Sequence, residues 1–128
     1  GVNIELTFSK VPVIQEADAL AKQFILPDNA MRNWNEYEHS VIMNNQEAFP
    51  WMVDPQTNGG LLFTCDPDEI QNVLNSTNQE VWVIGECTDV QEGEKPMVVV
   101  NPILSCLGSG FQEGIAQAAF RVFWCGGE

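Results

Sequence analysis

Hydrophobic and polar positions alternate at the start of the chain, where every second residue from Val2 to Phe8 is apolar. A period of two predicts a half-buried β-strand. Pro12 ends this strand because proline gives no hydrogen-bond donor to a ladder. From Ile14 to Phe24 the apolar residues recur three and four apart, which is a helical period. The chain therefore opens with a strand followed by a helix.

The middle of the chain combines polar, irregular stretches with short apolar runs. Asn29 to Trp51 follows no clear period, although Val41 to Met43 could form a short strand. Leu61 to Cys65 is a continuous apolar run that is typical of a buried central strand. Pro67 to Leu74 is expected to form a helix, since an aspartate precedes it and proline favours a first turn.

Two further strands are predicted, at Val81 to Gly85 and at Met97 to Val100. Strands that alternate with helices favour an α+β fold in which helices cover a mixed β-sheet. Residues 102–128 differ in character, because three glycines precede a helix-prone stretch from Ile115 to Trp124. We therefore divide the chain into a sheet-forming part, 1–101, and a helix-prone tail.

Composition and charge exclude several classes of function. The 128 residues fit one domain, and 45% of them are hydrophobic, which is enough for a core. Five Lys and Arg stand against 18 Asp and Glu, so the formal net charge is −13. This balance argues against binding to nucleic acid and to anionic membranes. No apolar run reaches the roughly 18 residues that a membrane span requires. We expect a cytoplasmic protein.

Isolated reactive side chains give weak signals. The four cysteines show no close pair, so a zinc site is disfavoured and reduced thiols are expected. His39 beside Glu38 could act in acid–base chemistry, but a histidine in a polar stretch is more typical of a surface residue. Glu36, Glu38 and Glu47 could bind a divalent ion or simply form a solvated face. We predict no catalytic residue and no metal site.

The most specific stretch runs from Asp54 to Leu62 and reads Asp-Pro-Gln-Thr-Asn-Gly-Gly-Leu-Leu. Paired glycines permit positive φ or a close approach of the backbone to another group. Neighbouring polar side chains beside free amides could cradle an anion or a phosphate. The alternative is a turn followed by a tightly packed strand. The candidate ligand loop comprises Asp54, Gln56, Thr57, Asn58, Gly59 and Gly60.

This stretch is similar to the signature loop of the C-terminal domain of selenophosphate synthetase (selenide, water dikinase), where serine commonly replaces Asn58. That domain belongs to the superfamily related to aminoimidazole ribonucleotide synthetase. The resemblance covers residues 1–100 approximately and implies part of that fold, while 102–128 match nothing in it. Further matching segments are Gly1 to Leu6, Val11 to Val13, Met31 to Asn33 and Val83 to Cys87. The family carries glycine and threonine near Asn29 and Ala30, so that loop is expected to differ in shape.

The resemblance implies ATP-dependent phosphorylation of selenide to selenophosphate, with release of AMP and phosphate. The family's nucleophilic cysteine or selenocysteine, its catalytic lysine and its magnesium-binding loops have no counterpart in this sequence. We therefore expect a part that is not self-sufficient and binds no cofactor of its own, whereas the whole enzyme uses Mg²⁺ and ATP. The alternative is a non-catalytic binding or interaction module of the same fold.

The family resemblance also implies partners for this chain. The family's N-terminal catalytic domain is an implied partner. A sheet without the family's upstream elements would leave an apolar face or edge uncovered, which is a liability in solution. We therefore expect a homodimer, with the tail from Gly108 to Trp124 in the contact.

Overall fold

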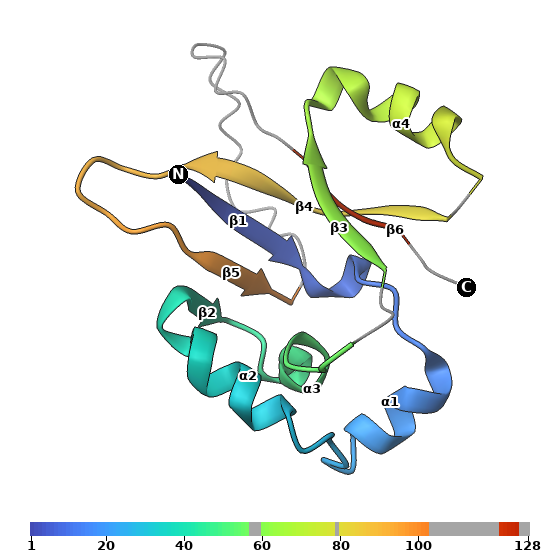
Figure 1. Cartoon of the computed structure of the whole chain (residues 1–128), viewed down its shortest axis with the longest axis vertical. Helices are drawn as coiled ribbons and strands as arrows, with labels where there is room; N and C mark the ends of the chain where they lie inside the picture. The colour runs from blue at the N-terminus through green and yellow to red at the C-terminus, as the bar shows by residue number, and fades with distance from the viewer. Residues whose placement is uncertain (57–59, 79, 103–120, 126–128) are drawn as a thin grey trace.

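A computed structural model describes residues 1–56, 60–78, 80–102 and 121–125 of the chain. One six-stranded sheet dominates the architecture, with strand order β2-β5-β1-β4-β6-β3 (Figure 1). The strands are β1 (Val2–Thr7), β2 (Val41–Met43), β3 (Leu61–Cys65), β4 (Val81–Asp89), β5 (Val98–Asn101) and β6 (Arg121–Cys125). The α-helices are α1 (Gln15–Ala21), α2 (Ala30–Tyr37), α3 (Phe49–Met52) and α4 (Ile70–Ser76). Within the described residues there are also four 3₁₀ turns, η1 (Phe8–Lys10), η2 (Glu38–Ser40), η3 (Gln46–Ala48) and η4 (Pro67–Glu69).

The sheet is mixed, as the sequence predicts. Strand β1 lies at its centre, antiparallel to β4 and parallel to β5. Strand β2 is parallel to β5 at one edge. Strand β6 pairs antiparallel with both β4 and β3 at the other end. In Figure 1, α1, α2 and α3 gather below the central strands, and α4 lies at the opposite end of the view beside β3. The α+β prediction is confirmed.

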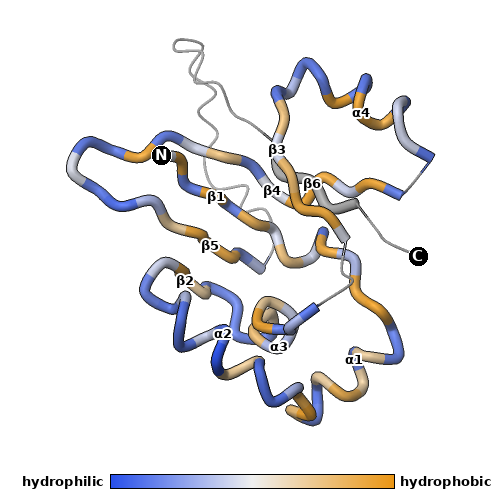
Figure 2. The backbone as a smooth tube through the Cα atoms, viewed as in Figure 1, coloured by the Kyte–Doolittle hydropathy of each residue, from blue (hydrophilic) through white to orange (hydrophobic). Residues whose placement is uncertain are grey.

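The core lies over the central strands β1, β4 and β5. Its apolar residues are spaced along these strands, and Figure 2 shows hydrophobic stretches running through the middle of the sheet. The buried cluster comprises Leu6, Ala48, Ile84, Cys87 and Val100. Ala48, in η3 just before α3, brings that helix against the sheet. The part of the chain that the structure describes holds no helix long and apolar enough to cross a membrane.

One predicted strand and one predicted helix need correction. Leu61–Cys65 is a strand, but it forms the sheet edge rather than a buried centre, and Leu61 is 66% exposed. A short apolar run cannot distinguish a central strand from an edge strand. The helix predicted for Ile115 to Trp124 is wrong from residue 121 to 124, because these residues belong to β6 (Arg121–Cys125). The aromatic and β-branched residues there suit a pleated sheet. The other residues of that prediction lie outside the described part.

The segment from Asn29 to Trp51 is more regular than its sequence indicates. It contains α2, η2, β2, η3 and most of α3. Helix α2 has a narrow apolar stripe in which Ala30 is fully buried and Trp34 is half-buried. Its remaining positions are mostly polar, which hides the helical period. This segment places two helices against the sheet.

Candidate functional site

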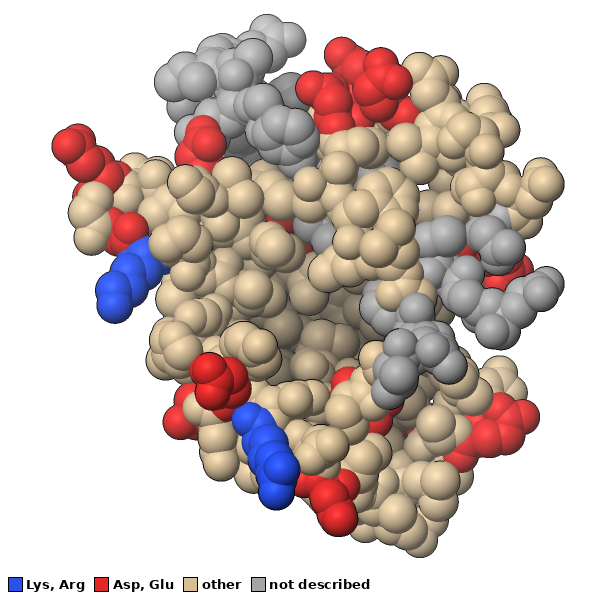
Figure 3. Space-filling model, in the orientation of Figure 1, with Lys and Arg blue, Asp and Glu red and all other residues tan. Residues whose placement is uncertain are grey.

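The candidate ligand loop opens onto a cavity of about 600 Å³ between the sheet and the helices α2 and α3. Asp54, Gln56 and Gly60 all line this cavity. Thr57, Asn58 and Gly59 lie outside the described residues. Figure 3 shows the surface hollowed near the middle of the view, between the strands above and the helices below. The loop predicted from sequence therefore borders a concave site.

The floor of the cavity is apolar and comes from five strands. Its residues are Leu6 of β1, Val41 and Met43 of β2, Leu62 of β3, Ile84 of β4, and Val98 and Val100 of β5. Three of them belong to the buried core, so the floor is held by packing from beneath. A densely packed floor keeps its shape, because side chains in a core occupy defined rotamers.

Aromatic side chains form the helical wall. Trp34 and Tyr37 come from α2, and Trp51 comes from α3. Trp34 packs edge-on against Phe49, with ring centroids 5.2 Å apart and planes at 74°. This is a favoured aromatic geometry, and it ties α2 to the start of α3. The structure thus places both Trp34 and Trp51 at the cavity.

Tyr37 was missed because the polar segment around it conceals the helix. The signal was present, since Ala30, Trp34 and Tyr37 stand four and three residues apart. Such spacing places side chains on one face of a helix.

Two hydrogen bonds set the start of the loop. Asn33 Nδ2 on α2 donates to the carbonyl oxygen of Val53 at 3.0 Å. Gln56 Nε2 donates to Asp54 Oδ2 at 3.0 Å. The first bond fixes the chain immediately before Asp54, and the second turns the Asp54 carboxylate toward Gln56. Asn33 lies in the Arg-Asn step that the sequence comparison singled out.

Replacing Asn33 by alanine is expected to lower the free energy of unfolding by about 1 kcal/mol, because a part-buried bond to Val53 is lost. Urea unfolding followed by tryptophan fluorescence measures this change. Asn35→Ala, on the exposed side of the same helix, serves as the control and should stay within about 0.5 kcal/mol of the parent. Equal losses in the two variants would show that the bond does not hold the loop.

The charge of the cavity limits its chemistry. Asp54 contributes a carboxylate, and the described lining residues include no lysine, arginine or histidine. A bound phosphate would therefore need cations from other groups. Within the described ranges, no group of three Asp, Glu, His or Cys is placed to hold a metal ion. Glu36, Glu38 and Glu47 do not converge on an ion, and His39 is exposed.

The two described free cysteines are held in the neutral form. Burial raises the pKa of the Cys87 thiol. Desolvation, followed by the charges of Asp66 and Glu69, raises the pKa of the Cys65 thiol. Since the thiolate is the nucleophile, both environments disfavour nucleophilic chemistry. Neither thiol lines the cavity.

Several known proteins that share one name are similar to this chain. A selenide, water dikinase of Photorhabdus laumondii is 31% identical over 104 residues, which is 79% of this chain and 30% of the relative. The enzyme of the same name from Pseudomonas straminea is 39% identical over 102 residues, or 73% of this chain and 27% of the relative. Over the matched residues, the chain is homologous to the selenide, water dikinases. No family model matches it.

Similarity to the selenide, water dikinases agrees with the resemblance of the Asp54–Leu62 loop. A third relative, from Citrifermentans bemidjiense, is 34% identical over 79 residues, which is 62% of this chain and 23% of the relative. The chain thus spans less than a third of the length of the relatives it matches. The match covers one part of each of these longer proteins.

Proposed function

We propose that this chain is the C-terminal part of an ATP-dependent selenophosphate synthetase, which converts selenide, ATP and water into selenophosphate, AMP and phosphate. We further propose that it is inactive without the rest of that enzyme. The observation that carries this is the cavity itself. Asp54, Gln56 and Gly60 of the family loop border it, yet its described lining offers no cation.

Phosphoryl transfer depends on positioning and on cations that neutralise the transferring group. In our proposal, Mg²⁺ and ATP are bound chiefly by the rest of the enzyme. The loop then contributes a rigid polar edge that orients the ligand, and the apolar floor excludes water from one side. Thr57, Asn58 and Gly59 remain candidate ligand contacts on the evidence of the sequence.

The assembly is part of the same proposal. The catalytic N-terminal domain is the first partner, and a cytoplasmic homodimer is the expected form of the complete enzyme. Exposed apolar side chains on this chain support a partner, because large exposed patches on a protein mark interaction sites.

The proposal predicts that the isolated chain produces no AMP from ATP and selenide above a heat-denatured control. AMP should appear when the chain is co-expressed with a Photorhabdus laumondii enzyme that lacks its matching segment. The positive control supplies the missing Photorhabdus laumondii segment as a separate chain. Asp54→Ala should reduce the restored rate about tenfold to a hundredfold through misplacement of the ligand.

Gln71→Ala, on the exposed surface of α4, provides the matched control and should leave the restored rate unchanged. AMP formation by the isolated chain would contradict the dependence on a partner. Restoration by the relative's own segment, but not by this chain, would favour the alternative of a non-catalytic binding or interaction module.

A further inference from the structure

Helix α1 and its flanks carry large apolar side chains that are exposed to solvent. None of its seven residues is buried. Helices this short are unstable in water unless an apolar face packs against something. We define the α1 patch as four exposed residues on α1 and its flanks. They are Ile14 (70% exposed), Leu20 (49%), Phe24 (76%) and Ile25 (56%). Leu20 lies on α1, whereas Ile14 precedes the helix and Phe24 and Ile25 follow it, so the helix and its two flanks carry apolar side chains that the described chain leaves uncovered.

Phe24 is held in an unusual backbone conformation at the end of α1. Its φ is +55°, and it is the one non-glycine residue with positive φ among those described. The amide of Ile25 donates to the carbonyl of Leu20 at 3.0 Å, which is the longer bond of a Schellman motif. Glycine usually occupies this position, and an L-residue there costs about 1 kcal/mol. Phe24 keeps this strained conformation although its phenyl ring is exposed. Such an exposed ring is typical of a residue that anchors an interface.

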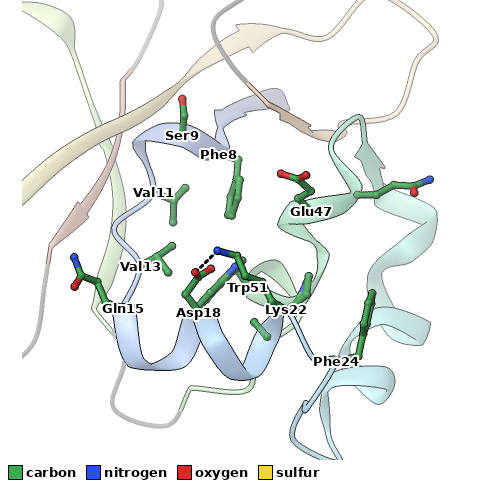
Figure 4. A pocket seen from close by; sticks show the side chains of 13 residues that line it. Phe8, Ser9, Val11, Val13, Gln15, Asp18, Lys22, Phe24, Glu47 and Trp51 are labelled. Carbon is green, nitrogen blue, oxygen red and sulfur yellow. Dashed lines mark hydrogen bonds and ion pairs between the residues drawn. The ribbon is translucent and has the colours of Figure 1, made fainter.

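A cleft of about 860 Å³ lies beside the patch, between α1, η1 and α3. Figure 4 shows Phe8, Val11 and Val13 on one side of it and Trp51 near its base. Trp51 belongs to α3 and also lines the loop cavity. A polypeptide segment bound in the cleft would therefore contact Trp51, which is also a side chain of the candidate site.

The polar groups of the cleft leave it acidic. Lys22 Nζ donates to Asp18 Oδ2 within α1, and this bond raises the pKa of Lys22. The Glu47 carboxylate extends from η3 toward the cleft (Figure 4). The cleft therefore holds two carboxylates, of Asp18 and Glu47, and one ammonium group, of Lys22, which is already bonded to Asp18. An approaching lysine or arginine would find a complementary charge at Glu47.

We propose that the α1 patch and this cleft form the docking surface for the rest of the selenide, water dikinase polypeptide. The docking segment presents apolar side chains to Phe24 and Leu20 and a basic residue to Glu47. The identity of this partner rests on the proposed function. The relatives carry more than two thirds of their length outside the matched segment, which supplies such a partner. The net charge of −13 disfavours an anionic membrane on this surface, and a second copy is one outcome of the test.

The test measures binding rather than activity. The tagged full chain is titrated, without ATP or selenide, against the Photorhabdus laumondii enzyme lacking its matching segment. We expect Phe24→Asp to weaken binding about 30-fold, as for an interface hot spot. Leu74→Asp, on the distant helix α4, should change binding less than about twofold. Phe24→Asp should keep the parent's melting temperature because its ring is exposed.

Each outcome decides the proposal. Failure of the parent chain to bind, or full binding by Phe24→Asp, overturns the docking surface. If Phe24→Asp binds fully while AMP production is still restored, the surface is wrong and the proposed function stands. Light scattering that shows a parent dimer and a Phe24→Asp monomer would assign the patch to a second copy. As an independent check, Glu47→Lys should slow association at low salt.

Discussion

Replacing Gly85 by alanine is expected to lower the free energy of unfolding by about 3 kcal/mol, because the new methyl group would collide with the backbone of β1. Gly85 lies opposite Leu6 in the antiparallel β1–β4 pair. A Cβ built there would lie 2.2 Å from the carbonyl oxygen of Glu5 and 3.1 Å from the Cα of Leu6. Backbone atoms in the centre of a sheet cannot rotate aside, so the two strands must separate.

Urea unfolding measures this loss, and Gly93→Ala is the matched control. Gly93 has φ of +88° but no atom within 4 Å of an added Cβ. Its substitution should cost about 1 kcal/mol from backbone conformation alone. A Gly85→Ala midpoint at or above that of Gly93→Ala would contradict the close approach of β1 and β4.

The local pattern of the sequence predicts most elements that the structure contains. Alternation identifies β1, and apolar runs identify the core positions of β4 and β5. The helix expected from Pro67 to Leu74 appears as η4 followed by α4. These elements are predictable because each carries its own period or capping residues within a short window.

Sheet order was not predictable by the same means. The sequence of β3 predicts a central strand, but β3 lies at the edge of the sheet, and β6 separates it from β4. The partner of β3 lies more than fifty residues later in the chain, and local periodicity contains no information about that pairing. The apolar period from Ile14 to Phe24 has the same limit. Periodicity identifies an apolar face without showing whether this chain covers it.

The sequence likewise predicts one part of the candidate site and misses the other. Asp54, Gln56 and Gly60 were found from a contiguous motif, and they line one cavity. The wall that faces them comes from Trp34 and Trp51, on helices that the polar sequence conceals. Only packing against the sheet brings these side chains to the loop. A motif can thus identify one edge of a site while tertiary structure supplies the opposite wall.

Ile84→Ala is expected to lower the free energy of unfolding by about 3 kcal/mol, since it removes a buried side chain and leaves a cavity in a packed core. Ile84 is 2% exposed on β4 and also forms part of the floor beneath the candidate loop. The neighbouring strands pair on both sides of β4, so the backbone cannot collapse into the space.

Ile42→Ala is the matched control for Ile84→Ala, because Ile42 is 44% exposed on the edge strand β2. Removing its side chain should cost less than about 1 kcal/mol, since little buried area is lost. Urea unfolding of both variants, fitted with a common slope, tests the contrast. Similar losses at the two positions would place the core elsewhere than over β1, β4 and β5. The expected contrast follows because the side chains that form the floor of the cavity also hold the sheet together.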